Sequence, residues 1–127
     1  MTRLLLVGLA GAIGTCARYL VGLGAGRMLG TGFPFGTLIV NVVGCFLIAV
    51  IAEVALTTEL ISPTLRLTLT TGFMGGLTTY SSFNLETTRL MQERAWYAAA
   101  VNFGVTVIGC FLAGVLGFAV ARRVIGS

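Results

Sequence analysis

The stretch from Gly72 to Glu86 contains the residues whose types and spacing could do chemistry in this chain. It holds three glycines, five hydroxyl side chains and an asparagine, and apolar segments flank it. Such a run is expected to interrupt a helix, because these residue types favour other backbone conformations. Inside a membrane, irregular backbone is tolerated only where protein buries it or where it lines a cavity or an ion path. We therefore expect the functional centre here.

Polar side chains also lie inside two other apolar segments. Asn41 is the one strongly polar residue deep in its segment, so it either hydrogen-bonds to another helix or faces a polar pathway. A second set recurs at a spacing of four and forms one stripe along a helix, and it consists of Asn102, Thr106, Cys110 and Gly114. This stripe either pairs helices or lines a pore.

Arg18 carries a charge near the end of the first apolar segment and is followed by Tyr19. One interpretation is an arginine that reaches the membrane interface beside an interfacial aromatic residue. The other is a cation that draws anions into a vestibule.

The composition indicates an integral membrane protein. Of the 127 residues, 57% are hydrophobic and only 9% are charged, whereas soluble domains average about 25% charged residues. The net charge of +4 comes from eight scattered arginines rather than from a basic patch, which speaks against nucleic-acid binding. The three cysteines, Cys16, Cys45 and Cys110, lie in apolar segments of a chain without histidine, so we interpret them as packing residues.

The positioning elements are expected to be four transmembrane helices that form a single domain, residues 1–127. A helix needs roughly 20 residues to cross the hydrocarbon, and four spans fill most of the chain. The expected spans are 4–22, 36–56, 64–91 with a break at 74–79, and 96–121. A glycine-rich connection is expected between the first two, over 23–34.

The distribution of charge predicts that the chain inserts in both orientations. An even number of spans puts both termini on one side, which then carries Arg3, Arg66, Arg122 and Arg123. The other side carries Arg18, Arg27, Arg89 and Arg94. Orientation normally follows an arginine or lysine excess on the cytoplasmic loops, and here neither side has one. An antiparallel homodimer with a two-fold axis in the membrane plane follows naturally.

Three motifs in this order resemble the Fluc (CrcB) fluoride channels. They are Gly75-Gly-Leu-Thr-Thr-Tyr-Ser-Ser-Phe83, Gly14-x-x-x-Arg18-Tyr19 and Gly36-Thr37-x-x-x-Asn41-x-x-Gly44. The resemblance covers essentially the whole chain: its length, its four spans, its broken third helix and the order of the motifs.

The resemblance implies an antiparallel dual-topology homodimer with two pores that export fluoride passively from the cytoplasm across a bacterial inner membrane. It implies a structural Na⁺ on the dimer axis, held by the backbone carbonyls of Gly75 and Thr78, and vestibule charges at Arg18 and Glu86. The pore residues that it implies are Asn41, Thr79, Tyr80, Ser81, Ser82, Phe83, Asn102, Thr106 and Cys110.

Two positions depart from the pattern of that family. The family usually has phenylalanine where this chain has Tyr80, and the added hydroxyl can donate to an anion or occupy its site. Slower or altered conduction is therefore expected. The stripe of the fourth helix more often begins with an aromatic hydroxyl and continues with serine, whereas here it runs from Asn102 to Cys110, whose S–H group is a weak donor.

The side chains in the motif suit a small, strongly hydrated anion. A channel must replace the water around such an ion with donors, yet bind the ion weakly enough to release it. Neutral amides and hydroxyls do this, and aromatic rings add electropositive edges. Tyr80 and Phe83 lie three residues apart and so share nearly the same helical face. Plain core packing is the other interpretation of this aromatic pair.

The main rival is a small multidrug transporter, which is also a four-helix dual-topology dimer. Such transporters depend on a glutamate embedded in the first helix, and the first segment here has no acid. The glutamates lie at or towards the ends of the expected spans, at Glu53, Glu59, Glu86 and Glu93. A chaperone-like assembly subunit would not need a broken helix with aligned hydroxyls. An enzyme is not expected, because the chain has no histidine and no nucleophile–base pair.

Overall fold

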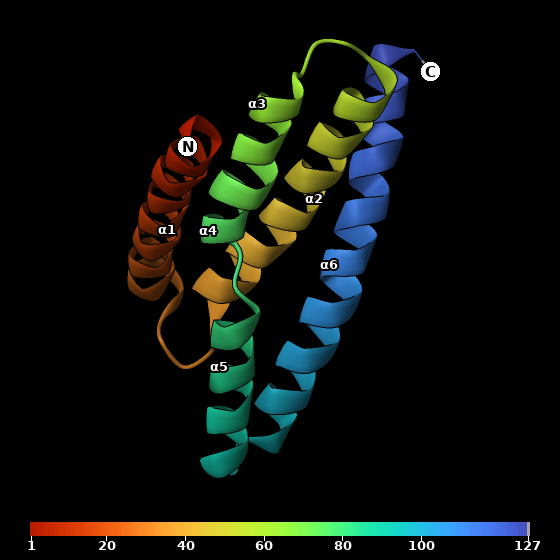
Figure 1. Cartoon of the computed structure of the whole chain (residues 1–127). Helices are drawn as coiled ribbons and strands as arrows, with labels where there is room; N and C mark the ends of the chain where they lie inside the picture. The colour runs from red at the N-terminus through yellow and green to blue at the C-terminus, as the bar shows by residue number, and fades with distance from the viewer. Residues whose placement is uncertain (127) are drawn as a thin grey trace.

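The computed structural model describes residues 1–126, and these fold into helices joined by short connections (Figure 1). The helical elements in chain order are α1 (Thr2–Leu29), α2 (Phe35–Thr57), α3 (Pro63–Leu67), the π-helical η1 (Thr68–Met74), α4 (Gly75–Leu77), α5 (Tyr80–Gln92) and α6 (Trp96–Ile125). Both ends of the chain lie at the same end of the bundle (Figure 1). The chain therefore passes along the bundle four times, in alternating directions.

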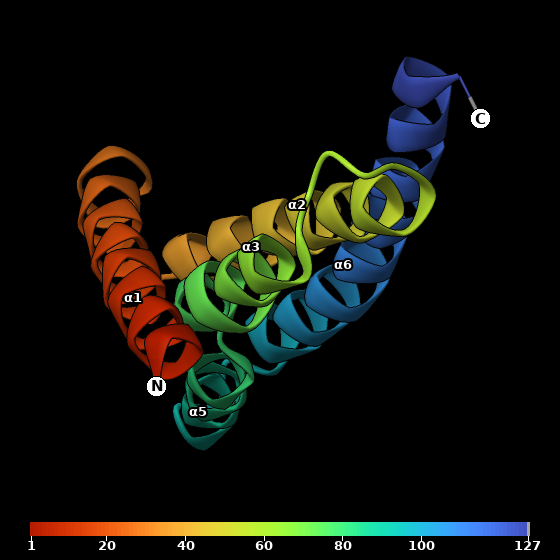
Figure 2. The same cartoon turned by 45° about the horizontal axis from the view of Figure 1, so that its top comes forward.

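The first, second and fourth passes all pack against the third. Helices α2 and α6 lie against each other along much of their length, whereas α1 packs mainly on η1 and also contacts α2 and α4. In Figure 2, α1 and α6 lie on opposite sides of the bundle with α2 and α3 between them. The third pass, from α3 to α5, thus contacts all the others and is the part that the other helices position.

Helix α1 is longer than the sequence predicted. The expected connection over 23–34 is wrong for its first part, because the helix continues to Leu29. Each glycine in a helix costs only about 1 kcal/mol relative to alanine, and several of the residues between the glycines here are apolar. The helix ends at Gly30, whose φ of 84° lies in the left-handed region that favours glycine.

Local sequence signals set the boundaries of the next two elements. Pro34 precedes the first residue of α2, where a fixed φ and a missing N–H cost little. Ser62 caps α3, because its Oγ accepts a hydrogen bond of 3.1 Å from the N–H of Leu65, and Pro63 occupies the first helical position. The Ser62–Pro63 pair therefore starts the third pass where the sequence predicted it.

The break in the third pass is narrower than the predicted 74–79. The backbone stays helical through Leu77, and only Thr78 and Thr79 are extended, with ψ of 154° and 114°. Gly75 and Gly76 belong to the short helix α4. Thr79 then starts α5, because its Oγ1 accepts a hydrogen bond of 3.1 Å from the N–H of Ser82. A two-residue interruption therefore joins two helices almost end to end (Figure 1).

Three helices are long and apolar enough to cross a membrane: α1, α2 and α6. The third pass is divided into shorter pieces and does not qualify as one span, so the fourth span stays a prediction. Large apolar side chains of α1 and α6, such as Leu9, Ile13 and Phe111, are more than half exposed. This surface is that of a membrane protein, because lipid rather than water is its natural surrounding.

Glycines bring α1 into close contact with the third pass. A Cβ added to Gly14 would collide with the carbonyl oxygen of Phe73 and lie 2.9 Å from the amide nitrogen of Leu77. A Cβ added to Gly76 would collide with the carbonyl oxygen of Gly11. Small residues permit such backbone approach in lipid, where van der Waals packing drives helix association.

We expect the Gly14→Ala substitution to lower the free energy of unfolding by about 1–3 kcal/mol, because the added methyl group overpacks a contact with backbone atoms that cannot move aside. Thermal denaturation in detergent micelles measures the effect. Gly8→Ala is the matched control on the same helix, since a Cβ at Gly8 meets no atom within 4 Å. Equal melting temperatures for the two variants would contradict the close packing of α1.

Candidate functional site

A cavity of about 360 Å³ lies beside the break between α4 and α5. Three parts of the chain line it: α2, the segment from the break into α5, and the middle of α6. The lining residues are Asn41, Cys45, Thr78, Thr79, Tyr80, Phe83, Thr106, Val107 and Cys110. The wall therefore combines one amide, hydroxyls, thiols and aromatic rings, and none of its residues carries a formal charge.

Asn41 holds the break in place through two hydrogen bonds to one residue. Its Oδ1 accepts from the N–H of Thr79 at 2.8 Å, and its Nδ2 donates to the carbonyl of Thr79 at 3.1 Å. The side chain thereby takes the place of the helical partners that the extended residue has lost. Gly44, one turn further along α2, leaves room for the Thr78 methyl group, which a Cβ at that position would meet. Of the two interpretations of Asn41, the structure confirms the hydrogen bond to another helix. Asn41 also lines the cavity, and a polar pathway there stays a prediction.

The hydrogen bonds at the break divert two donors from their usual acceptors. In a continuous helix the N–H of Thr79 would bond to the carbonyl of Gly75, but it donates to Asn41. The N–H of Ser82 would bond to the carbonyl of Thr78, but it donates to the Thr79 hydroxyl. The carbonyls of Gly75 and Thr78 therefore lose their helical donors. These are the two residues that the sequence assigned to a cation.

Arg18 reaches the break from α1. Its side chain is half-buried, and its Nε donates to the carbonyl oxygen of Gly76 at 3.1 Å. A cation is favourable at this position, because the carbonyl end of a helix carries partial negative charge. Arg18 therefore points inward to the end of α4, which distinguishes it from an arginine that only reaches the membrane surface.

The two aromatic residues of α5 contact each other edge to face. The ring centroids of Tyr80 and Phe83 are 5.7 Å apart with an interplanar angle of 73°. Phe83 is only 4% exposed and also packs on Phe103, with centroids 6.1 Å apart. Tyr80 is 80% exposed within the single chain. The pair therefore joins the buried side of α5 to a surface that this chain leaves uncovered.

Asn102 is part of a buried chain of hydrogen bonds rather than of the cavity wall. It is 2% exposed; its Nδ2 donates to the Thr87 hydroxyl at 2.8 Å, and its Oδ1 accepts from the Thr106 hydroxyl at 3.3 Å. The Thr87 hydroxyl in turn donates to the carbonyl of Phe83 at 2.7 Å. The first residue of the α6 stripe thus pairs α6 with α5, as one interpretation predicted. Thr106 and Cys110 line the cavity, and their use in a pore stays a prediction.

Glu86 lies one turn beyond Phe83 along α5. Its Oε1 accepts a hydrogen bond of 2.6 Å from the hydroxyl of Thr37 on α2. It lines cavities at the end of the bundle away from the termini, near Thr31 and Pro34. Thr37 shares a face of α2 with Asn41 and lies one turn before it. The pairs Thr37–Glu86 and Asn41–Thr79 therefore join α2 to the third pass at two neighbouring levels.

The structure brings most of the predicted site residues together. Six of the nine predicted pore residues line the cavity, and these are Asn41, Thr79, Tyr80, Phe83, Thr106 and Cys110. Ser81 and Ser82 are adjacent to it, with the Ser81 Oγ 3.3 Å from the Thr79 Oγ1. Asn102, Arg18, Glu86 and Gly75 lie outside the wall.

Sequence reasoning missed three residues with clear roles. Thr87 accepts a hydrogen bond from the Asn102 amide. The sequence signal that could have found it is its position four residues after Phe83. Cys45 lies on α2, one turn after Asn41, and also lines the cavity. Buried Glu53 accepts a hydrogen bond of 3.1 Å from the Nε of Arg122 and so ties the end of α2 to the end of α6. No local sequence pattern predicts a pairing of residues that lie so far apart in the chain.

The fold and the site define a class of protein: a helical membrane protein with a cavity of uncharged residues at the break of one helix. The chain matches the model of the family described as "CrcB-like protein, Camphor Resistance (CrcB)" over residues 5–118. It is 55% identical to a fluoride-specific ion channel FluC of Sorangium cellulosum over all of both chains. It is 46% identical to a protein of the same name from Geobacter metallireducens, over 97% of this chain and 99% of that one. The chain belongs to the CrcB family.

These comparisons confirm two of the expectations from the sequence. The resemblance to the Fluc (CrcB) family is correct, because the family model covers most of the chain. The chain is not an enzyme, since its relatives are named as ion channels. A further relative from Anaeromyxobacter sp. has the same name and is 52% identical over 89% of this chain and 90% of its own.

We expect Asn41→Ala to lower the free energy of unfolding by about 3 kcal/mol, because it leaves both the N–H and the C=O of Thr79 without their partners. Thermal denaturation in detergent, followed by far-ultraviolet circular dichroism, measures the loss. Asn84→Ala is the matched control, since Asn84 is exposed and its side chain makes no hydrogen bond within residues 1–126. If both variants melt at the wild-type temperature, Asn41 does not hold the break.

Proposed function

We propose that this protein is a passive, fluoride-selective channel, and that the ion passes along the cavity beside the break. The observation that carries the proposal is the wall of this cavity, which offers an amide, hydroxyls and ring edges but no formal charge. The names of the relatives support it, since each is a fluoride-specific ion channel.

The chemistry of this wall suits an anion that must move. A fixed cation in the path would hold fluoride too tightly, whereas neutral donors replace its water and then release it. The amino-terminal end of α5 faces the break, and free N–H groups and the helix dipole favour an anion there. The hydroxyls of Thr79, Ser81 and Ser82 add donors within the same turn, while the edges of Tyr80 and Phe83 offer weak positive potential. Asn41 and Thr106 close the wall from the other helices.

The functional unit that we propose is an antiparallel homodimer with two pores. Support comes from the balance of four arginines on each side, which leaves neither orientation favoured. Support also comes from Tyr80 and Ser81, which are exposed beside the break at a depth where lipid offers no hydrogen bonds. A second copy covers these groups and completes the wall of each pore. The third pass then serves as the missing fourth span.

We further propose that the break holds a structural Na⁺. The carbonyls of Gly75 and Thr78 fit such an ion, because their helical donors are diverted and oxygen atoms are hard ligands for a hard cation. One chain supplies only two oxygens, so a second copy on the two-fold axis supplies the other two. The ion would fix the two breaks against each other and add positive potential beside the anion path. Arg18, one residue away at the carbonyl of Gly76, adds to the same potential.

In a cell the channel would let fluoride leave the cytoplasm down its gradient, across the inner membrane of a bacterium. The small-multidrug alternative has no observation in its favour, because no acidic side chain lines the cavity and α1 contains none.

We expect purified protein in liposomes to release fluoride and to retain chloride, as two ion-selective electrodes would record. Phe83→Ile should reduce the fluoride flux at least roughly a hundredfold, since the branched aliphatic side chain fills part of the space but has no electropositive edge. The elution volume on a sizing column should not change. Tyr80→Phe is the matched control, because it keeps the ring and removes only the hydroxyl, and it should conduct at least as fast as wild type.

Full fluoride flux in Phe83→Ile would remove the ring edge from the mechanism. Release that requires a proton gradient, or no release from Tyr80→Phe, would contradict a passive fluoride channel.

We expect three lysines inserted in the loop 30–34 to leave only one orientation and to reduce the flux to the level of empty vesicles, because parallel copies cannot form the dimer. The complementary variant carries three lysines in the loop 58–62 and should be equally inactive alone. Co-expression of the two should restore flux. Full flux from either variant alone would refute dual topology.

A further inference from the structure

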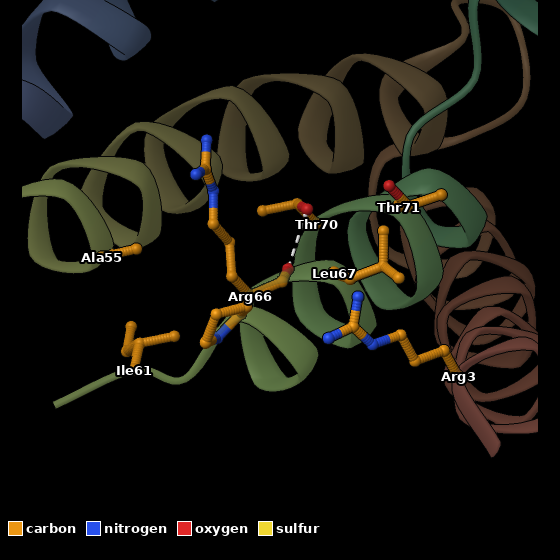
Figure 3. A pocket seen from close by; sticks show the side chains of 8 residues that line it. Arg3, Ala55, Ile61, Arg66, Leu67, Thr70 and Thr71 are labelled. Atoms are coloured by element: carbon orange, nitrogen blue, oxygen red, sulfur yellow. Dashed lines mark hydrogen bonds between the residues drawn. The ribbon is translucent and has the colours of Figure 1, made fainter. Parts of the chain in front are cut away.

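A second cavity, of about 420 Å³, lies at the end of the bundle that carries the chain termini (Figure 3). Its wall comes from the start of α1, the end of α2, the loop that follows α2, and the region where α3 passes into η1. Figure 3 shows Arg3 extending from α1 towards α3, and Arg66 extending from α3 towards α2. Two guanidinium groups from different helices therefore flank one cavity.

These two arginines have no acidic partner within residues 1–126. The ion pair found there joins Arg122 to Glu53. Arg3 uses its Nε to donate to the Thr64 hydroxyl at 3.2 Å, which leaves its terminal nitrogens available, and the Arg66 side chain makes no hydrogen bond among the described residues. Glu59, the acid on the neighbouring loop, neither lines the cavity nor pairs with either arginine.

The rest of the wall is largely apolar and lies where the membrane ends. The apolar helix α2 finishes at Thr57, and Ser62–Pro63 starts the next pass, so this level is the boundary between hydrocarbon and headgroups. Ile61 and Leu67 line the cavity, and the Thr70 hydroxyl is already bonded to the carbonyl of Arg66 at 2.8 Å. The wall of the cavity therefore combines two cationic side chains with apolar ones.

We propose that this cavity binds the phosphate-bearing headgroup of an anionic phospholipid. The guanidinium fork matches the oxygens of a phosphate in two parallel hydrogen bonds, which a lysine cannot offer. Basic pockets between helices at the membrane boundary bind such headgroups in other membrane proteins. The apolar side chains of the wall receive the start of an acyl chain, whereas a soluble phosphate ion would leave them without a partner. The site lies away from the cavity at the break and does not depend on the proposed channel activity.

The test measures lipid binding to the purified full-length protein in a neutral detergent. Phosphatidylglycerol and phosphatidylcholine are titrated separately, and the rise in melting temperature gives an apparent dissociation constant for each. For the wild type we expect a preference for phosphatidylglycerol of about tenfold or more. The double variant Arg3→Gln, Arg66→Gln should lose the preference to within about twofold, because the two positive charges that favour an anionic headgroup over a zwitterionic one are gone.

The matched control is Arg27→Gln, Arg123→Gln, which removes the same net charge from exposed arginines outside this cavity, and it should keep the preference. Thr71→Trp tests the space rather than the charge: it retains both arginines, fills the cavity and should also weaken the preference. Circular dichroism confirms that each variant is helical. An unchanged preference in the Arg3, Arg66 double variant, or an equal loss in the control, would overturn the site. Millimolar inorganic phosphate that raises the melting temperature as much as the lipid does would overturn the assignment to lipid.

Discussion

The interaction on which the rest of the structure depends is the pair of hydrogen bonds between the Asn41 side chain and the backbone of Thr79. A helix cannot stop inside hydrocarbon unless the peptide groups at the interruption find partners. One amide supplies both an acceptor and a donor, so a single residue of α2 satisfies the extended residue completely. The position of α2 is in turn fixed by its long contact with α6. The break is therefore a stable feature of the fold, because hydrogen bonds from the continuous helix α2 hold it in place.

The break also separates two opposite electrostatic environments within a few residues. The carbonyl end of α4 faces Arg18 and favours positive charge, while the amino end of α5, capped by Thr79, favours negative charge. Because the two helices meet almost end to end, both environments occur at the same depth in the bundle. A continuous helix would cancel them. The proposed cation and the proposed anion path would each meet a favourable environment at the break, without a fixed charge in the cavity wall.

The sequence predicted an all-helical membrane protein and most of the residues that line the cavity, because apolar helices and helix breaks follow from composition and local backbone preference. It was less successful where the outcome depends on distant partners. The break is two residues long rather than six, since Gly75 and Gly76 remain helical and α1 packs closely on Gly76. Helix α1 continues past Gly22 and Gly26 because few competing turn signals interrupt its apolar residues. Asn102 and Thr106 share a stripe, yet only Thr106 lines the cavity, because Thr87 on α5 lies within reach of Asn102.

A single copy of the chain leaves the centre of its own site unfinished. Gly75, Tyr80 and Ser81 are exposed beside the break, so backbone and hydroxyl groups would face lipid at the level where unsatisfied polar groups cost most. Buried side-chain polar atoms within residues 1–126 all have hydrogen-bond partners, so the polar groups left for a partner to cover are exposed ones. The economical solution is a partner that presents the same exposed groups, because an isologous contact matches each group with its own copy. The balance of arginines between the two sides permits the antiparallel arrangement that brings two breaks to the same depth. In the proposed antiparallel dimer, the helix break, the uncovered face of α5 and the balance of arginines would all follow from one requirement.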